Sequence, residues 1–472
     1  MVPFSPIRRL QIAFALFVLT LLLFYHQDSG ANAASRLLIV YALVENGTHV
    51  ADEWSDTTLD KAIINGHVYS DKAPLSSYLV VPFYWLWRLP GGEQSAFDRS
   101  VAMHMGTVIC SAIPFVIYGL MLLGRVRRTA PKVGSCGVWA VLFVLFGTFI
   151  FHYGNAYFGH LLGGLLMVAS YALLVEGTRT ARQNQSGPSP RRVFLAGLLG
   201  GLSVLAEYPL LLTQAVLVFH LAGSRDRLSR LPFFLIGSAG PAAFLLAYNT
   251  WITGSPWSFA YAWHAGFPEM KNALALGSPS AEALWGLTLS RYRGAFVFGP
   301  LLLVMLLPRR RRAPAARARA VLVNVLCIVH LLFFTCYDYW SGGNTAGPRF
   351  LVPAAMLLCY EHIGWALRQP WSRYVFAGLG AVGLLINILA AATSPFAPAD
   401  CFNPIVQFYL PYARRGQFNP HTLLVEWGLL ARSSLTLLKI WMILFLLGAT
   451  LLARAWGRVP GEGDASELTR SK

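Results

Sequence analysis

The sequence predicts an all-α integral membrane protein with about 11–13 transmembrane helices and a structured first extracytoplasmic loop. Hydrophobic residues make up 56% of the chain and charged residues only 12%, whereas soluble domains carry about 25% charged residues. Apolar runs of about 14 to 23 residues recur along the chain, close to the length that crosses a bilayer as a helix. Lys and Arg gather in short clusters between these runs, as is typical of cytoplasmic loops.

Charge placement orders the spans across the membrane. Arg8 and Arg9 place the N-terminus inside, and later clusters such as Arg309–Arg312 also fall inside when the apolar runs alternate. Residues 1–455 are therefore expected to form one polytopic membrane domain, followed by a polar cytoplasmic tail at 456–472. The expected spans are Leu10–Tyr25, Val101–Leu123, Val138–Phe151, Tyr157–Val175, Val193–Ala206, Pro209–Leu221, Phe233–Trp251, Leu284–Leu307, Val321–Phe334, Phe350–Leu367, Val375–Ala392 and Leu435–Leu452.

Long polar or broken segments are expected on the outer face. The inner loops are short and basic, so we expect the chemistry of the protein on the outer side. The aromatic stretch Pro74–Leu89 either spans the membrane or lies half-inserted at the interface, and the second interpretation keeps the basic cluster that begins at Arg125 inside. The expected outer segments are 26–73, 253–283, 337–349 and 393–434.

Several other classes of protein are excluded by composition and motifs. The net charge of +17 does not indicate nucleic-acid binding, because the basic residues are dispersed among the loops. The six cysteines form no CxxC pair and are interpreted as small buried hydrophobic residues. No nucleotide-binding loop, HExxH or GxSxG motif is present. No cofactor and no metal site is therefore predicted, and a divalent cation at the outer carboxylates stays open.

The first outer loop, 26–73, differs in charge from the rest of the chain. It carries seven acids against three bases, a net −4 within a chain of net +17. Asp28, Asp52 and Asp56 are candidate catalytic carboxylates, because an acid near the membrane surface can serve as a general base or bind a cation. Lys72 precedes a turn-forming Ala-Pro pair and can hold a phosphate as a point charge. The competing interpretation is a solvated loop whose charges keep it out of the lipid.

The segment Tyr337–Phe350 is a second candidate, because its Gly-Gly and Gly-Pro pairs predict sharp turns. Arg349, directly before a span, can bind a phosphate with its forked guanidinium at headgroup depth. Tyr339 and Trp340, together with Tyr69 of the first loop, are candidate contacts for a sugar or a lipid. Aromatic side chains in these places are equally typical of the aromatic belt of a membrane protein.

Charged residues at the outer ends of two further spans complete the candidates. Arg291 and Arg293 lie where the charge bias of membrane proteins opposes them, and a bound lipid phosphate or annular headgroups would explain them equally. Glu207 lies near membrane depth, but Pro209 beside it favours a structural role at a helix end.

Three stretches resemble the GT-C superfamily of polytopic glycosyltransferases, which includes protein O-mannosyltransferases and the aminoarabinose transferases of lipid A. The first is NGHVYSDKAPLSSYL (Asn65–Leu79), which resembles the segment that closes the first outer loop in the family. The others are SRYRGAFVFGPLLL (Ser290–Leu303) and YDYWSGGNTAGPRFLVP (Tyr337–Pro353), which resemble a bacterial branch. The resemblance covers about residues 10 to 360.

The resemblance implies an inverting transfer of a sugar from a polyprenyl-phosphate donor to a glycan, lipid or protein acceptor. The active side would face outward from a plasma or bacterial inner membrane. Lys72 and Arg349, with Arg293 as a third cation, would hold the donor phosphate. The acid pair of the family falls near Asn32–Ser35, where this chain has no acid.

The missing acid pair leaves two explanations and a rival function. Either the base has shifted to Asp28, Asp52 or Asp56, or the chain is an altered member of the superfamily without activity. A lipid-linked saccharide flippase is the alternative from another class, and it predicts ionisable residues along a path through the membrane.

Overall fold

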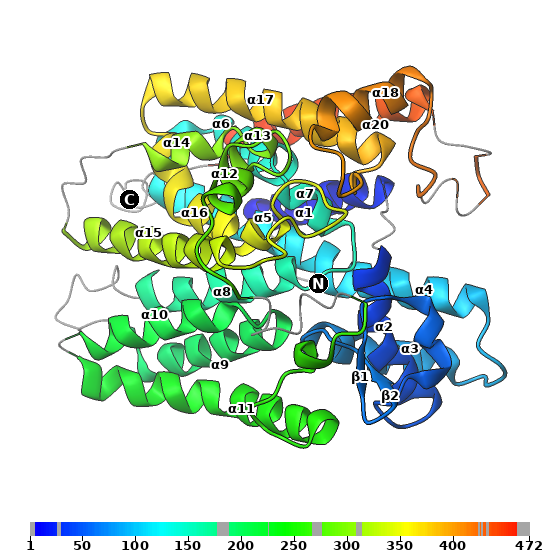
Figure 1. Ribbon diagram of the computed structural model, residues 1–472. Helices are drawn as coiled ribbons and strands as arrows, with labels where there is room; N and C mark the ends of the chain where they lie inside the picture. Colours follow the sequence, from blue (N-terminus) through cyan, green and yellow to red (C-terminus); the bar gives the residue numbers. More distant parts are fainter. Residues whose placement is uncertain are drawn as a thin grey trace.

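The computed structural model describes residues 5–25, 30–176, 188–224, 226–266, 276–307, 314–422, 425, 428–430 and 434–459. Figure 1 shows a helical bundle with one small β-hairpin, so the predicted all-α class is confirmed. The long helices are α1 (Pro6–Phe24), α2 (Gly30–Glu45), α3 (Leu75–Arg88), α4 (Ala96–Thr107), α5 (Ile113–Thr129), α6 (Cys136–Phe146), α8 (His160–Glu176), α9 (Pro190–Ala206), α10 (Leu210–Ala222), α11 (Arg227–Thr253), α15 (Pro314–Thr335), α16 (Val352–Ala366), α17 (Pro370–Thr393) and α20 (Leu435–Gly457).

Short helices and turns connect these elements. The shorter α-helices are α7 (Ile150–Gly154), α12 (Ala281–Thr288), α13 (Ala295–Phe298), α14 (Leu302–Leu306) and α18 (Leu410–Arg414). Single 3-10 or π turns lie at η1 (Asp52–Thr57), η2 (Val108–Ala112), η3 (Pro131–Val133), η5 (Ala260–Trp263), η7 (Arg349–Leu351) and η8 (Ile405–Tyr409).

In the described part of the chain, six helical segments are long and apolar enough to cross a membrane. They mark the chain as an integral membrane protein. Three shorter apolar helices, α6, α8 and α10, fall on further expected spans. The six are α1, Ala96–Thr129 (α4 and α5 joined through η2), α11, α15, α17 and α20.

The expected span Leu284–Leu307 is wrong as a single helix. It is divided among α12, α13 and α14. Pro300 has no backbone N–H to continue the helix, and Gly299 before it leaves helical geometry at φ −155°. The carbonyl of Phe298 that the break exposes accepts a hydrogen bond of 2.9 Å from Asn387 Nδ2 of α17. The break is therefore satisfied from a neighbouring helix, as buried backbone requires.

The first outer loop has more regular structure than its polarity indicates. Its apolar stretch forms α2, and the acidic stretch behind it forms η1 and a hairpin of β1 (Ala62–Ile64) and β2 (His67–Tyr69). Asn65 and Gly66 connect the strands with φ values of +52° and +86°, the conformation that makes Asn-Gly the preferred two-residue hairpin turn. The helix α3 follows with 14 residues and is not among the candidate spans.

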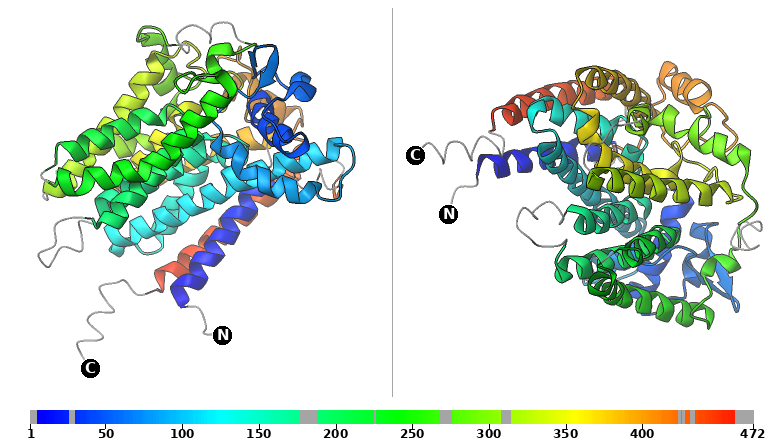
Figure 2. Two further views of the ribbon diagram at one scale, coloured as in Figure 1. Left: turned by 90° about the horizontal axis from the view of Figure 1, so that it is seen from below. Right: turned by 90° about the vertical axis from the view of Figure 1, so that its left-hand side faces the viewer.

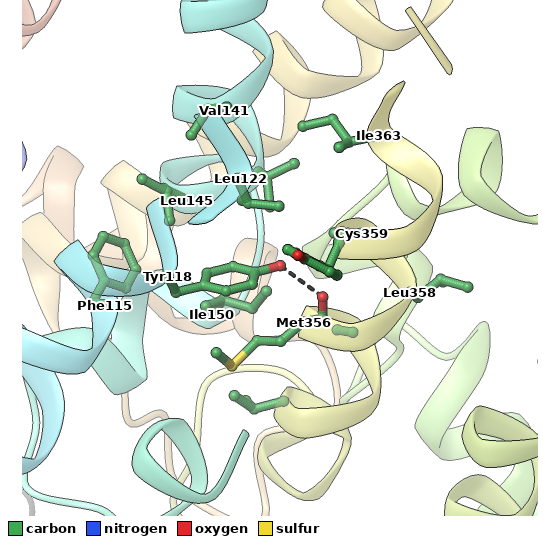
Figure 3. Close-up of a cluster of buried hydrophobic side chains, with 14 of the residues drawn as sticks. Phe115, Tyr118, Leu122, Val141, Leu145, Ile150, Met356, Leu358, Cys359 and Ile363 are labelled. Carbon is green, nitrogen blue, oxygen red and sulfur yellow. Dashed lines mark hydrogen bonds between the residues drawn. The ribbon is translucent and has the colours of Figure 1, made fainter. Parts of the chain in front are cut away.

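The core lies between helices that are distant in sequence. Figure 3 shows Phe115, Tyr118 and Leu122 of α5 packed against α6 and α16, where Tyr118 Oη donates a 2.8 Å hydrogen bond to the carbonyl of Met356. In the left panel of Figure 2, α1 and α20 run side by side toward the two termini, and the β-hairpin lies at the opposite end.

A polar cluster lies deep among four helices. Arg125 of α5 forms a buried ion pair with Glu361 of α16, and Arg125 Nε donates a 3.2 Å bond to the carbonyl of Tyr360. Tyr171 Oη of α8 donates to Glu361 Oε2 at 3.1 Å, and Arg319 Nε of α15 lies 3.7 Å from Oε1. We call these four side chains, Arg125, Tyr171, Arg319 and Glu361, the inner cluster.

Candidate functional site

A small polar cavity of about 30 Å³ is enclosed where the first loop meets the helical bundle. Its volume holds about two water molecules. Charged and aromatic side chains from five segments of the chain converge on it, although these segments are far apart in sequence. The lining residues are Asn32, Arg36, Asp60, Lys72, His160, Glu207, Tyr261, Tyr337, Tyr339, Arg349 and Phe350.

Lys72 sits at this cavity between two carboxylates. Its Nζ lies 3.0 Å from Asp60 Oδ2 and 2.8 Å from Asp71 Oδ2, and the side chain is only 4% exposed. Ser35 Oγ of α2 donates a 2.7 Å hydrogen bond to the other oxygen of Asp71. His264 Nε2 lies 3.4 Å from Asp71 Oδ2 and 3.8 Å from Asp60 Oδ1. The hairpin segment, α2 and η5 are thereby joined through one buried charge network.

This network changes the pKa values of Asp60 and Lys72 in the directions that favour their charged forms. Burial acts to raise the pKa of Asp60, but Lys72, a hydrogen bond from His264 and the charge of Arg349 together lower it well below its usual range. Burial acts to lower the pKa of Lys72, but Asp60 and Asp71 outweigh it and raise it. Both groups are therefore charged at neutral pH.

Arg36 of α2 forms the second charged group of the cavity. Its Nη2 donates a 2.9 Å hydrogen bond to Glu207 Oε1, and its Nη1 donates one of 2.7 Å to Ser76 Oγ. Its Nε reaches Asn32 Oδ1 at 3.3 Å. His160 Nδ1, at the first residue of α8, lies 3.3 Å from the same oxygen of Glu207. Burial raises the pKa of Glu207, and the positive charges of Arg36, Arg349 and Lys72 oppose the rise.

Arg349 differs from the other two cations of the cavity because it forms no ion pair with an acid in the described part of the chain. None of the described residues accepts a hydrogen bond from its guanidinium, and its buried Nε is unpaired. The guanidinium carbon lies 4.8 Å from the ring centre of Phe350 and 5.8 Å from that of Phe158. Gly342, at φ +73°, leaves room for it, because a Cβ there would lie 2.8 Å from Arg349 Nε. Within the described residues, the site therefore presents one cation without an ion-pair partner, which favours an anion.

Arg293 does not line the cavity. Its guanidinium is fully buried and donates 2.8 Å hydrogen bonds to the carbonyls of Thr345 and Gly343 and a longer one to that of Ala397. These contacts hold the loop that carries Arg349 against the segment after α17. The geometry gives Arg293 a role in positioning this loop, in place of the expected direct contact with phosphate.

The three expected catalytic acids are not brought together at the cavity. Asp52 is exposed and accepts hydrogen bonds from the backbone N–H of Val68 and from His67 Nδ1, and the bond from His67 lowers its pKa. Asp56 is exposed and lines a separate open groove of about 420 Å³. Asp28 lies outside the described residues. The carboxylates at the cavity are Asp60 and Glu207.

The structure places the three expected aromatic contacts in three different surroundings. Tyr339 lines the cavity. Trp340 instead packs edge-to-face on Tyr292 with ring centres 6.1 Å apart, close against Gly286. Tyr69 lies in the hairpin beside a small apolar cluster. Tyr261 and Tyr337 lie at the cavity in their place, and the Tyr261 ring is 5.5 Å from Lys72 Nζ.

Only weak sequence signals point to the residues that complete the site. Asp60 lies in the acidic loop beside other acids of similar appearance, and Glu207 looks like the end of a helix. Arg36 is the one base inside an otherwise largely apolar stretch of α2, and this position was the available signal. Among the described residues, no group of three or more His, Cys, Asp or Glu side chains is placed to hold a metal ion.

Comparison with known proteins finds similarity in overall structure only. No protein-family model and no curated protein matches the sequence. The structure is similar to ArnT from Cupriavidus metallidurans bound to undecaprenyl phosphate, with 15% identity and a TM-score of 0.46, over 95% of this chain and 77% of that chain. ArnT in the apo state gives the same identity and TM-score over 96% and 77%. The apo oligosaccharyltransferase of Archaeoglobus fulgidus gives 15% identity and a TM-score of 0.35, over 96% of this chain and 56% of that one.

Proposed function

We propose that the protein is a membrane glycosyltransferase that moves a sugar from a polyprenyl-phosphate donor to an acceptor on the extracytoplasmic face. The observation that carries this proposal is Arg349, a cation that forms no ion pair with any described residue and shares a small polar cavity with Lys72. Such a pair supports binding of a phosphate group, because a forked guanidinium and an ammonium both donate to its oxygens.

The chemistry follows from the charge that develops during the reaction. An acceptor hydroxyl attacks the anomeric carbon, the bond from that carbon to the phosphate oxygen breaks with inversion, and negative charge grows on the leaving polyprenyl phosphate. Fixed cations aimed at this charge stabilise the transition state more than the ground state. Lys72 is held in place by Asp60 and Asp71, so it needs little reorganisation when the donor binds.

A lipid-linked donor matches the position of the cavity. It lies where the bundle of membrane helices meets the first loop, and α3 beside it exposes Phe83, Trp85 and Trp87, as expected for a helix at a membrane interface. The basic clusters of the sequence assign the opposite end of the bundle to the cytoplasm. The proposed active side is therefore extracytoplasmic, in a plasma or bacterial inner membrane.

Binding of undecaprenyl phosphate to the purified full-length protein tests this proposal. Native mass spectrometry of the wild type is expected to show the bound lipid, and Lys72→Ala and Arg349→Ala are expected to lose it. Arg291→Ala is the matched control, because Arg291 is an exposed arginine two residues from Arg293 and does not line the cavity. Equal retention of the lipid by all four proteins would contradict the phosphate site.

A further inference from the structure

The proposed transfer needs a group that accepts the proton of the acceptor hydroxyl, and the inference below rests on that proposed function. A general base must have a lone pair available at the cavity. The two acids that line the cavity, Asp60 and Glu207, can be compared by what their oxygens already bind.

Both oxygens of Asp60 face side-chain nitrogen atoms. Oδ2 is 3.0 Å from Lys72 Nζ, and Oδ1 is 3.8 Å from His264 Nε2. Its lowered pKa makes it a weak proton acceptor. Asp71 is fully buried behind Lys72 and does not line the cavity. Both acids therefore serve to hold Lys72.

The contacts of Glu207 with its neighbours involve one of its two carboxylate oxygens. Arg36 Nη2 and His160 Nδ1 both approach Oε1, at 2.9 and 3.3 Å. Oε2 forms no hydrogen bond with the residues that the structure describes, and it is not among the buried unpaired atoms. The side chain keeps 15% of its surface exposed and lines the cavity. One carboxylate oxygen is thus fixed and the other is available to a ligand.

Arg36 also connects Glu207 to Asn32 of α2. The same guanidinium donates to Asn32 Oδ1 through Nε and to Glu207 Oε1 through Nη2. Asn32 therefore lines the cavity as a neutral amide, and a carboxylate from the turn between α9 and α10 faces the same space. We infer that Glu207 is the general base of the transfer, and that Arg36 and His160 are positioning residues that orient its carboxylate.

The step balances without any further reactant. The acceptor O–H bond breaks as its oxygen bonds to the anomeric carbon, and the proton passes to Glu207 Oε2. The electron pair of the broken carbon–oxygen bond leaves with the polyprenyl phosphate, which gains one negative charge. The proton on Glu207 then returns to solvent or to the departing phosphate, so the enzyme is regenerated.

Among the described residues, the charged and titratable groups around Glu207 are Arg36 of α2, His160 of α8, Lys72 of the first loop, Arg349 of the loop before α16, and the tyrosines Tyr208 and Tyr261. Burial raises the pKa of Glu207, which makes its carboxylate a better proton acceptor than that of Asp60. Turnover is therefore expected to fall as the pH decreases through the pKa of Glu207.

The experiment compares donor binding with turnover in full-length variants. Synthetic undecaprenyl-phosphate hexoses and pentoses serve as donors, water or membrane extract serves as acceptor, and release of undecaprenyl phosphate is measured against pH. Glu207→Gln preserves an oxygen for Arg36 and is expected to lower turnover by about 10²- to 10⁴-fold, with undecaprenyl phosphate binding changed less than about twofold. Glu53→Gln, an exposed acid of the first loop, is the matched control with unchanged turnover.

Rescue by a small carboxylate distinguishes a chemical role of Glu207 from a structural one. Sodium formate is expected to restore part of the turnover of Glu207→Ala, because it supplies the missing base, and to leave Glu53→Gln unchanged. Wild-type turnover in Glu207→Gln would overturn the assignment, as would absence of rescue by formate or a loss of donor binding equal to the loss of turnover. A wild type that neither binds undecaprenyl phosphate nor releases it would remove the proposed function, and this assignment with it.

Discussion

Two polar clusters in the same membrane protein differ in how their charges are compensated. In the inner cluster, Glu361 lies between Arg125 and Arg319 and also accepts a hydrogen bond from Tyr171. At the cavity, Lys72 and Arg36 form ion pairs with acids, but none of the described residues forms an ion pair with Arg349. Both arginines of the inner cluster thus lie within 4 Å of Glu361, whereas the cavity has one arginine with no carboxylate at that distance in the described part of the chain.

This difference separates a structural use of charge from a functional one. Ionisable residues inside a membrane are by default candidates for function, and they would be expected along the path of a flippase. The inner cluster instead joins α5, α8, α15 and α16, and both Arg125 and Glu361 are almost completely buried. It therefore connects these helices through buried polar contacts. The cavity combines an arginine without an ion-pair partner among the described residues, a small polar space and an available carboxylate oxygen, which a binding site needs.

The largest effect is expected from breaking the inner cluster. Glu361→Gln leaves Arg125 buried without its counter-charge, and removal of one partner of a buried pair costs roughly 3–5 kcal/mol. Thermal unfolding in detergent measures the loss, with Glu53→Gln as an exposed control. Stability equal to that of the wild type would show that this cluster does not stabilise the packing of these helices.

The converse effect is expected at the cavity. Arg349→Ala removes no hydrogen bond within the described chain, so the unfolding temperature is expected to change little. Turnover is expected to fall by about 10²- to 10³-fold, the cost of removing one donor to a developing oxyanion. Arg349→Lys should retain part of the activity, since it keeps the charge and loses the fork. A large loss of stability in Arg349→Ala would place this residue with the inner cluster.

Substitution of Arg293 distinguishes a structural role of this residue from direct contact with phosphate. Arg293→Ala leaves the buried carbonyls of Gly343 and Thr345 without donors, at a cost of roughly 2–3 kcal/mol. The unfolding temperature should fall, and undecaprenyl phosphate binding should weaken only as far as the Arg349 loop loses order. Complete loss of the lipid at unchanged stability would instead show direct contact with phosphate.

The pair of Asp60 and Lys72 gives a smaller, pH-dependent effect. The lowered pKa of Asp60 stabilises the fold above its ordinary value of 3.8, and this contribution is lost as the pH falls toward the lowered value. The raised pKa of Lys72 stabilises the fold below 10.5, and this is lost as the pH rises beyond it. The difference in unfolding temperature between wild type and Asp60→Asn should therefore stay constant from about pH 5 to 9 and shrink below about pH 4.

The smallest effects are expected from the exposed acids. Asp52→Asn and Asp56→Asn should leave turnover within about twofold of the wild type, because neither side chain lines the cavity. Release of undecaprenyl phosphate provides the measurement for both variants. A hundredfold loss in either one would return the general base to the first loop and exclude Glu207 from that role.

Much of the fold could be predicted because a bilayer imposes a simple rule on sequence. A helix that crosses it must be long and apolar, so α1, α11, α15, α17 and α20 correspond to expected spans. The break at Gly299-Pro300 was missed because the residues on both sides of it, 295–307, are apolar, and its backbone is satisfied by Asn387 from a distant helix. The helix α2 was missed because the acids around it make the whole loop appear solvated.

For the site, residue types and their positions along the chain are enough to identify which side chains are unusual in a membrane protein. Lys72 and Arg349 could be selected because charged side chains beside turns and apolar runs are few, and both lie at the cavity. Which acids accompany them depends on how distant segments pack together. Asp52, Asp56 and Asp60 share the same acidic stretch, and only the fold of the hairpin turns Asp60 inward. Glu207 is 171 residues away from Arg36 along the chain, and no local pattern specifies such a pair, because it forms only when α2 packs beside the turn that follows α9.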